Sequence, residues 1–229
     1  MTMPASWQEA VCWNDGVASV TVVGEDAREH TPFRHTGTLL GIMSRRSSSP
    51  PLQAVFLDRD GTLIRHVPYL RDPADVVLLP GVREGLARAR AAAVKLFLFT
   101  NQSGVGRGMF TLAEVEACNI RMIELLELGP QPFDGVCIAT ETPEEPQRYR
   151  KPSPRFIHEM LERHGIDHAA AWMLGDSPVD WEAGLNAGIH SAAIVPDPLA
   201  PKEPQRRESL GITAYASVLE WLLHVSGDL

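Results

Sequence analysis

The sequence predicts an α/β protein with a Rossmann-like sheet of about five parallel strands, helices on both faces and no large cap domain. From residue 53 onward, short apolar runs alternate with helical patterns, which is typical of a parallel sheet covered on both sides. The chain has 229 residues, 44% of them hydrophobic, so it can bury one sizeable core. We therefore expect a single folded domain over residues 51–229.

The expected strands are short apolar runs, as suits strands that are buried on both faces. They lie at residues 54–57, 94–99, 136–139, 171–174 and 191–195. Helices are expected at residues 83–93, 112–126, 154–164, 179–187 and 215–225, whereas none is predicted in the Pro-rich segment 196–207. Thr111 and Glu114 have the spacing of a capping box, and Gly165 is expected to end the third helix. A large cap domain does not fit, because the intervals 62–100 and 108–151 are needed for these elements.

Residues 1–50 differ from the rest of the chain and are expected to form a poorly structured N-terminal extension. They lead into a linker-like stretch of Ser, Arg and Pro at residues 44–51. One explanation is that translation begins at Met43. The other is a genuine appendage in which residues 19–23 pair as an edge strand, and the sequence favours neither.

The formal net charge is −8, so the sequence shows no basic stripe that would attract a nucleic-acid backbone. No apolar run approaches the roughly 20 residues that span a bilayer, and no secretory signal pattern is found in the first thirty residues. The three cysteines, Cys12, Cys118 and Cys137, have no metal-like or redox spacing, which suits a reducing compartment. We expect a cytoplasmic monomer that binds neither nucleic acid nor membranes.

Polar and acidic residues directly follow three expected strands, at the edge where parallel sheets bind their ligands. The first strand is followed by Asp58 and Asp60, the second by Thr100 and Asn101, and the fourth by Asp176 and Asp180. Two carboxylates two residues apart point to the same side, so Asp58 can meet an electrophile while Asp60 reaches a leaving group.

A hard divalent cation is the group that would let Asp58 approach a phosphate, because the two negative charges otherwise repel each other. Mg²⁺ accepts one or two carboxylates together with carbonyl and water oxygens. Asp176 is the expected second carboxylate ligand, and Asp180 is a further ligand or an anchor for its neighbours.

Each part of this pattern also has an ordinary structural explanation. An Asp-x-Asp at a strand end is more often a turn or a helix cap, and Asp176 or Ser177 could be a helix N-cap. The parts nevertheless occur in order and each after a buried strand, and this conjunction favours a functional site.

These segments also resemble the haloacid dehalogenase superfamily. Motif I resembles residues 56–63 (FLDRDGTL), motif II residues 100–101 (TN), motif III Lys151, and motif IV residues 175–180 (GDSPVD). Residues 100–108 (TNQSGVGRG) and 150–152 (RKP) resemble the branch, subfamily IIIA, that contains D-glycero-D-manno-heptose 1,7-bisphosphate and histidinol-phosphate phosphatases. The resemblance covers residues 52–194 and implies a phosphatase of a small phosphorylated metabolite, with heptose bisphosphate as first candidate and histidinol phosphate as second. It would place the chain in carbohydrate metabolism and lipopolysaccharide biosynthesis.

The resemblance implies a catalytic role for each matching residue. Asp58 is the nucleophile that forms an aspartyl-phosphate, and Asp60 protonates the leaving oxygen and later activates water. Lys151 neutralises charge that develops on the transferring group. Mg²⁺ is held by Asp58, by the backbone carbonyl of Asp60 and by Asp176.

Four residues are expected to bind the substrate. The resemblance implies that Thr100 and the amide of Asn101 hold the phosphoryl oxygens. The Gly-rich stretch 104–108 lacks the ending of a nucleotide-binding loop, so its flexible backbone and Arg107 suit contact with the rest of the substrate, unless it is a plain exposed turn. Arg150 is expected to contact the substrate or a second phosphate, unless it is a charged surface residue.

The chain departs from the family pattern at two places. Many members of the branch bind zinc with Cys and His before the Arg-Lys-Pro, whereas residues 137–149 contain one Cys and no His, so no zinc is expected. Ser177 stands where heptose-bisphosphate phosphatases commonly have Lys. Residues 149–152 also resemble the 3′-phosphatase domain of polynucleotide kinase-phosphatases, so a polynucleotide 3′-phosphatase stays an alternative. A non-enzymatic phosphate-binding regulator is a more remote one, because both motif I aspartates and Lys151 are intact.

Overall fold

The computed structural model describes residues 11–14, 17–20, 50–197, 199 and 202–226. Eight strands form one sheet: β1 (Val11–Asn14), β2 (Val17–Val20), β3 (Ala54–Leu57), β4 (Lys95–Asn101), β5 (Gly135–Ala139), β6 (Ala171–Gly175), β7 (His190–Ile194) and β8 (Ala214–Tyr215). The helices are α1 (Val82–Ala91), α2 (Ser103–Gly106), α3 (Leu112–Leu126), α4 (Arg155–His164), α5 (Pro178–Asn186), α6 (Pro204–Ser209) and α7 (Val218–Ser226), with 3-10 turns η1 (Pro73–Asp75) and η2 (His168–Ala170). Among the described helices, none has both the length and the apolar character that crossing a membrane requires.

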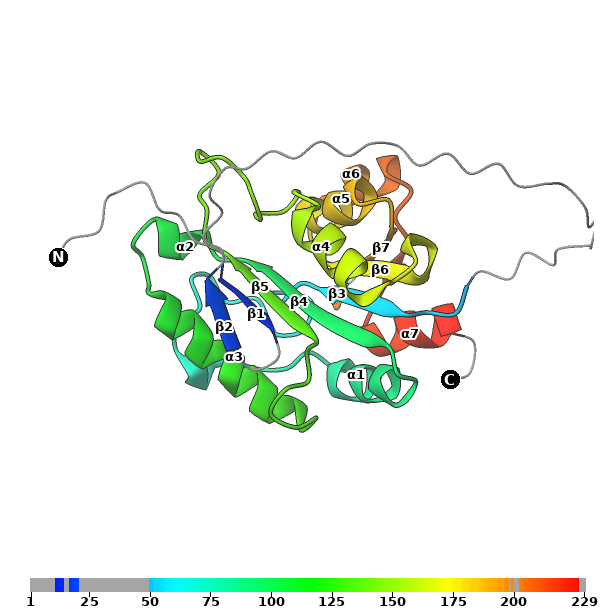
Figure 1. Cartoon of the computed structure of the whole chain (residues 1–229), viewed down its shortest axis with the longest axis horizontal. Helices are drawn as coiled ribbons and strands as arrows, with labels where there is room; N and C mark the ends of the chain where they lie inside the picture. The colour runs from blue at the N-terminus through cyan, green and yellow to red at the C-terminus, as the bar shows by residue number, and fades with distance from the viewer. Residues whose placement is uncertain (1–10, 15–16, 21–49, 198, 200–201, 227–229) are drawn as a thin grey trace, which may run out of the picture.

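The strand order in the sheet is β2-β1-β5-β4-β3-β6-β7-β8 (Figure 1). The six strands from β5 to β8 are mutually parallel, and β3 lies at their centre with β4 on one side and β6 on the other. All four residues of β3 are buried. Asp58 therefore follows the central strand of the sheet, with the ends of β4 and β6 on either side of it.

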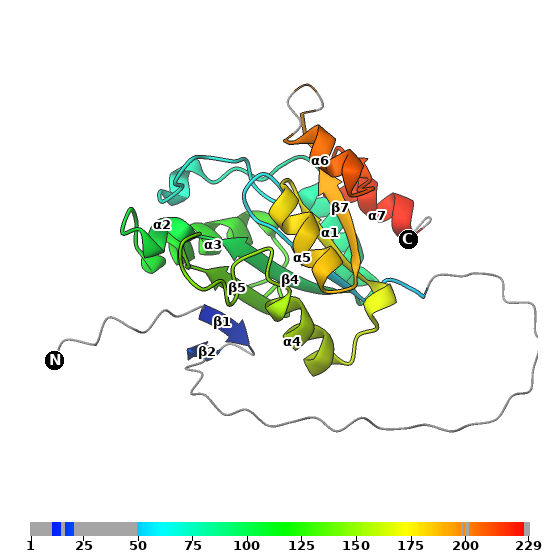
Figure 2. The ribbon, with the colours of Figure 1, turned by 90° about the horizontal axis from the view of Figure 1, so that it is seen from above.

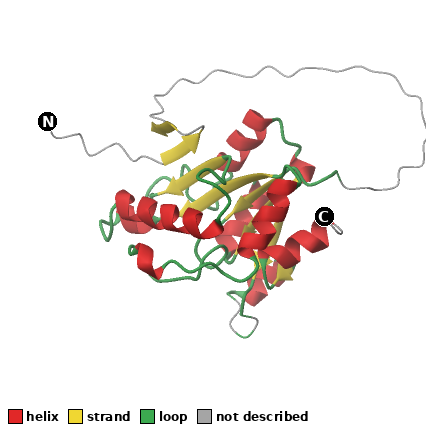
Figure 3. Cartoon of the chain, turned by 90° about the horizontal axis from the view of Figure 1, so that it is seen from below, coloured by secondary structure: helices red, strands yellow, loops and turns green. Residues whose placement is uncertain are grey.

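Successive residues of β3 face opposite sides of the sheet, as in any strand. Val55 and Leu57 pack in one core with helices α1, α3 and α7, which contribute Leu86, Met122 and Trp221. Viewed from below, helices lie across this face of the strands (Figure 3). Burial of these large side chains is the main stabilising contribution from this layer.

The other face of the sheet is covered by α4 and α5, as Figure 2 shows from above. Ala54 and Phe56 pack there with Phe156 and Ala183. The Phe56 ring stacks on Phe97 with centroids 4.7 Å apart and meets Phe156 edge to face at 6.0 Å. Helices on both faces confirm the predicted doubly covered α/β fold.

The predicted strands are present as β3 to β7, and the predicted helices as α1, α3, α4, α5 and α7, with bounds that agree within three residues. The capping box of Thr111 and Glu114 is formed, and Gly165, at φ 63°, ends α4 as expected. A cap domain could be inserted at residues 62–100 or 108–151. The first interval holds α1, and the second holds α3 and β5. These elements belong to the sheet or its covering layers.

The structure adds elements that the sequence analysis does not predict. β8 has two residues, too few for a periodic pattern, and it brings the parallel strands to six instead of about five. Residues 103–106 form the short helix α2 rather than a loop, and Gly104 packs so closely that an added Cβ would lie 2.1 Å from the Phe110 ring. Helix α6 starts at Pro204, within the Pro-rich segment, and proline is favourable at the first helical position.

β1 and β2 form an antiparallel hairpin, and β1 pairs with the outer edge of β5. The edge strand expected at residues 19–23 overlaps β2 at residues 19 and 20, while residues 21–23 and 44–49 lie outside the described residues. The division of the chain into an extension over residues 1–50 and a domain over residues 51–229 stays a prediction.

Candidate active site

A cavity of about 290 Å³ opens at the carboxyl ends of β3, β4 and β6. Its polar lining includes Asp58, Asp60, Asn101, Gln102, Lys151, Asp176, Asp180 and Lys202. Other lining residues are His66, Val67, Tyr69, Leu70 and Phe110. The volume is at the lower end of the range for small-molecule sites, which is roughly 300 to 1,000 Å³. The cavity therefore suits the reacting end of a small metabolite.

Asp58 is the first residue after β3 and lines the cavity. Its backbone N–H continues the parallel pairing by donating to Leu174 O at 2.9 Å, and the residue is 7% exposed. Burial raises the pKa of Asp58 to about 8; Lys151 opposes this rise, while Asp180 and Asp176 add to it. The ionised form of Asp58 is therefore disfavoured in the metal-free site, and an added cation would favour it.

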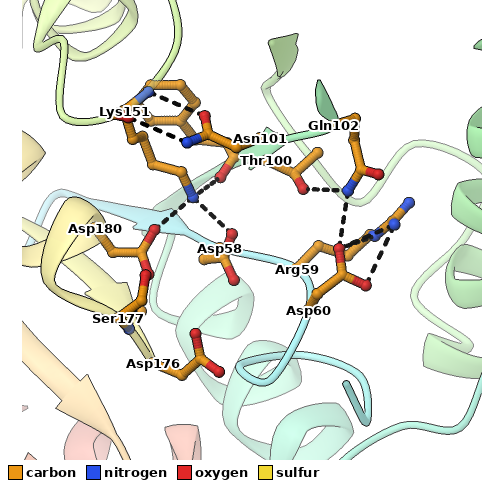
Figure 4. A network of polar contacts seen from close by, with 12 residues as sticks. Asp58, Arg59, Asp60, Thr100, Asn101, Gln102, Lys151, Asp176, Ser177 and Asp180 are labelled. Carbon is orange, nitrogen blue, oxygen red and sulfur yellow. Dashed lines mark hydrogen bonds and ion pairs between the residues drawn. The ribbon is translucent and has the colours of Figure 1, made fainter. Parts of the chain in front are cut away.

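Lys151 enters the same cluster from the loop between β5 and α4, at 1% exposure (Figure 4). Its Nζ lies 2.6 Å from Asp58 Oδ1 and 2.6 Å from Asp180 Oδ1, and it donates to Phe99 O at 2.7 Å. Burial alone would lower the pKa of Lys151, but the Asp180 and Asp58 carboxylates raise it above its ordinary value. The ammonium therefore stays charged beside Asp58.

The Asn101 side chain holds the backbone of Lys151. Its Nδ2 donates to Lys151 O at 3.2 Å, and its Oδ1 accepts from Lys151 N at 2.9 Å. This pair of bonds joins the end of β4 to the loop that carries the lysine. Asn101 also lines the cavity, and its contact with phosphoryl oxygens stays a prediction.

Asp180 is an anchor in this arrangement, one of the two roles expected for it. Its Oδ2 accepts from Ser177 N at 3.0 Å and from Ser177 Oγ at 2.5 Å, and its Oδ1 pairs with Lys151. Ser177 is the N-cap of α5. The same turn therefore caps a helix and places Asp180 beside Lys151. Because both oxygens of Asp180 have partners, it is less available to a metal ion than Asp58 or Asp176.

Asp176 follows β6 and is 9% exposed. Burial and the neighbouring Asp180 raise its pKa, while an ion pair with Lys202 lowers it. The backbone at Gly61 passes so close that an added Cβ would lie 1.9 Å from Asp176 Oδ2, and φ there is +92°. Only glycine fits this contact between the first and fourth motifs.

Three carboxylates offer a candidate metal site. One oxygen from each of Asp58, Asp176 and Asp180 lies within 4.8 Å of the other two. Opposite ligands of one Mg²⁺ are roughly 4 Å apart, so a small adjustment would let two of these oxygens share an ion. The donors are all hard oxygens, which suit Mg²⁺ rather than zinc.

Asp60 lines the cavity, and its carboxylate is turned toward Arg59 and Gln102 rather than toward Lys151 (Figure 4). Arg59 Nε donates to Asp60 Oδ2 at 3.0 Å, and Gln102 Nε2 donates to the same oxygen at 2.8 Å. Gln102 also donates to Thr100 Oγ1 at 2.8 Å. Thr100 is buried and is not among the residues that line the cavity, and its predicted contact with phosphoryl oxygens stays a prediction.

Arg107 and Arg150 do not line the cavity. Arg107 is exposed, and Arg150 is half-buried with Nη1 3.4 Å from Glu141 O. Burial and the nearby positive charge of Arg107 lower the pKa of Arg150. The role of Arg107 and Arg150 as substrate contacts stays a prediction.

The sequence does not predict several residues around the cavity. Arg59, Gln102 and Lys202 bind predicted site aspartates, and His66, Val67, Tyr69, Leu70 and Phe110 form part of the lining. Arg59 and Gln102 stand next to predicted site residues within the motifs, and this position is the sequence feature that could have indicated them. Lys202 comes from a segment distant in the sequence and carries no such signal. Cys137, the single cysteine of the loop expected to lack zinc, is buried in the core beside Phe99, and the absence of zinc stays a prediction.

The chain matches the family described as haloacid dehalogenase-like hydrolase over residues 58–194. It is 34% identical over 173 residues to the D-glycero-beta-D-manno-heptose-1,7-bisphosphate 7-phosphatase of Mesorhizobium japonicum, covering 72% of this chain and 79% of that protein. It is 36% identical over 150 residues to the Helicobacter pylori enzyme of the same name, covering 64% and 86%. A crystal structure of the D,D-heptose 1,7-bisphosphate phosphatase from B. bronchiseptica has a TM-score of 0.67 at 23% identity, covering 78% of this chain and all of that one.

The solved structure confirms the predicted fold, and the family match covers more than half of the chain, including all the predicted catalytic aspartates. The curated relatives are phosphatases, which supports the predicted enzyme class. This chain belongs to the haloacid dehalogenase-like hydrolases.

Proposed function

We propose that the chain hydrolyses a phosphomonoester by nucleophilic attack of Asp58, with Mg²⁺ as cofactor. The observation that carries this proposal is the contact of Asp58 Oδ1 with Lys151 Nζ at 2.6 Å, between two residues that line the cavity. In the described part of the chain the second oxygen of Asp58 has no hydrogen-bond partner, so it is available to a phosphorus atom. Phosphoryl transfer depends mainly on such positioning and on charge stabilisation.

Mg²⁺ fits the site because Asp58 and Asp176 supply hard oxygen ligands close together. When bound, it would neutralise the repulsion between the Asp58 carboxylate and the phosphate dianion. The backbone carbonyl of Asp60 is a third expected ligand, from the family resemblance.

The residues of the chain divide the remaining work. Asp58 forms the bond to phosphorus, and Lys151 holds positive charge beside the transferring oxygens. Asn101 fixes the lysine by binding its backbone, and Asp180 fixes its ammonium. Asp60 supplies a proton to the leaving oxygen and takes one from the attacking water.

The proposed substrate is D-glycero-D-manno-heptose 1,7-bisphosphate, cleaved at the 7-phosphate. Support comes from the names of the curated relatives, which are 7-phosphatases of this sugar. The second phosphate would meet Arg107 and Arg150, whose guanidinium groups suit phosphate oxygens. We further propose a cytoplasmic monomer that contains no zinc and binds no nucleic acid.

A panel of phosphate-release assays tests this proposal. With Mg²⁺, we expect the heptose bisphosphate, supplied as each anomer, to react faster than histidinol phosphate and a 3′-phosphorylated oligonucleotide. Asp58→Asn should abolish release from every substrate, whereas Asp75→Asn, an exposed aspartate of η1, should not change it. Preference for the oligonucleotide would overturn the substrate, and full activity of Asp58→Asn would overturn the mechanism. Stoichiometric zinc in the purified protein would overturn the proposed metal content.

A further inference from the structure

The carboxylate of Asp60 is held by two neighbouring side chains on the side away from Lys151 (Figure 4). Arg59 binds both of its oxygens, with Nε 3.0 Å from Oδ2 and Nη2 3.2 Å from Oδ1. Gln102 Nε2 adds a third bond to Oδ2 at 2.8 Å. Each carboxylate oxygen can accept two hydrogen bonds, so this arrangement still leaves acceptor capacity toward the cavity.

Arg59 is unusually well fixed for an arginine. It is 1% exposed, and its third nitrogen, Nη1, donates to Asn119 Oδ1 at 2.9 Å. Asn119 is buried on α3, on the opposite side of the guanidinium from Asp60. Because the guanidinium is planar, contacts on both sides fix its orientation and hence the direction of the Asp60 carboxylate.

Gln102 joins the ends of two strands. Its side-chain nitrogen donates to both Asp60 Oδ2 and Thr100 Oγ1 at 2.8 Å. Its backbone N–H donates to Ala139 O at 2.7 Å, which fixes the position of the residue itself. Its 6% exposure leaves little freedom to turn away from Asp60.

We infer that Arg59 and Gln102 are positioning residues that fix the Asp60 carboxyl group toward the leaving oxygen of the substrate. This inference rests on the proposed function. Within that function, each residue acts through its hydrogen bonds to Asp60. The half-buried Asp60 side chain, 20% exposed, lines the cavity on the side where these contacts hold it.

Both half-reactions require this orientation. In the first, an oxygen of Asp58 bonds to phosphorus, the phosphorus bond to the leaving oxygen breaks, and Asp60 transfers its proton to that oxygen. In the second, water bonds to phosphorus and gives a proton to Asp60 as the bond between phosphorus and Asp58 breaks. A misdirected Asp60 therefore slows the first step only when the leaving group needs a proton, and slows the second step for every substrate.

Rapid-mixing assays with two aryl phosphates test the inference. 2,4-Dinitrophenyl phosphate releases a stable phenolate without a proton, whereas phenyl phosphate needs one. In Gln102→Leu and Arg59→Lys we expect the rate constant of the first step to fall about thirtyfold for phenyl phosphate. This loss is within what general acid catalysis contributes. For the dinitrophenyl ester the same rate constant should fall less than about threefold. With the dinitrophenyl ester, a burst approaching one phenolate per protein should precede slow turnover.

Met122→Ala is the matched control, because Met122 is a fully buried residue of α3 that makes no polar contact with this network. Met122→Ala should lower the stability of the fold, and it should change the first-step rate by the same factor for both esters. A drop of equal size for both esters in Gln102→Leu, or no drop for either, would overturn the inference. If Arg59→Lys does not fold, Gln102→Leu alone decides. Asp58→Asn tests the proposed function separately, since activity in that variant with either ester would refute the nucleophile and not only the positioning.

Discussion

Lys151 Nζ lies 2.6 Å from Asp58 Oδ1, although 93 positions separate the two residues in the sequence. Lys151→Gln removes the charge that balances Asp58 and Asp180 in a buried site. We expect phosphate release to fall by about a hundredfold or more, and the free energy of unfolding at pH 8 to fall by about 3 kcal/mol. Steady-state kinetics and urea unfolding measure the two effects.

Lys95→Gln provides the control for this prediction. Lys95 pairs with Asp134 at 3.2 Å, but its side chain is 38% exposed. Such a pair contributes about 1 kcal/mol at most, so stability and activity should change little. Equal losses in the two variants would show that the buried position of Lys151 has no special importance.

Asp58→Asn should stabilise the metal-free protein at neutral pH. The folded-state pKa of Asp58, about 8, lies above the ordinary value of 3.8, so between these values the folded protein keeps a proton that the unfolded chain has lost. Wild-type stability should therefore fall as pH rises through this window, by up to about 1.4 kcal/mol per pH unit relative to Asp58→Asn. Urea unfolding in the presence of EDTA at several pH values measures the difference. Parallel curves for the two proteins would contradict the raised pKa.

Lys202→Met should strengthen Mg²⁺ binding. The Lys202 ammonium forms an ion pair with Asp176 and so competes with a cation for a proposed ligand. Because the lysine side chain is 44% exposed, the pair is weak, and we expect the Kd for Mg²⁺ to fall only about threefold. Calorimetric titration with Mg²⁺ measures this, with Lys95→Met as a control for lost positive charge. Weaker binding in Lys202→Met would mean that the lysine supports the metal site instead.

Gly61→Ala should disrupt the site more than the fold. The new Cβ would lie 1.9 Å from Asp176 Oδ2, so Asp176 must move, and Mg²⁺ binding and activity should fall by about a hundredfold or more. Gly129→Ala is the matched control. Its φ of +86° is close to the +92° of Gly61, but no atom lies within 4 Å of the added Cβ. Both variants should lose about 1 to 2 kcal/mol of stability from backbone strain. Activity in Gly61→Ala equal to that of Gly129→Ala would contradict the close contact.

Long, strongly patterned segments of the fold were predictable from the sequence, and segments that depend on distant partners were not. The capping box at Thr111 and the glycine at residue 165 set the ends of α3 and α4 through local chemistry. By contrast, β8 has two residues and forms only because β7 offers an edge to pair with. Helix α2 packs closely against Phe110 at Gly104, a contact that no local pattern reveals.

The same distinction applies to the site. Asp58, Asp60 and Asp176 follow strands whose carboxyl ends must meet at one edge of a parallel sheet, so the sequence could bring them together. The choice of Asp180 as anchor rather than ligand depends on hydrogen bonds to both of its oxygens, which only coordinates reveal. Lys202 reaches Asp176 across 26 positions of chain that include α5 and β7, and spacing alone gives no reason to expect it.

The pairing of β1 with β5 has a consequence for how the protein behaves at high concentration. β5 would otherwise end the parallel sheet with its outer backbone N–H and C=O groups open to solvent, and such a border recruits strands from other molecules. The hairpin occupies that border with a strand of the same chain. A variant without residues 1–20 should therefore keep its catalytic groups and yet self-associate, as light scattering would show.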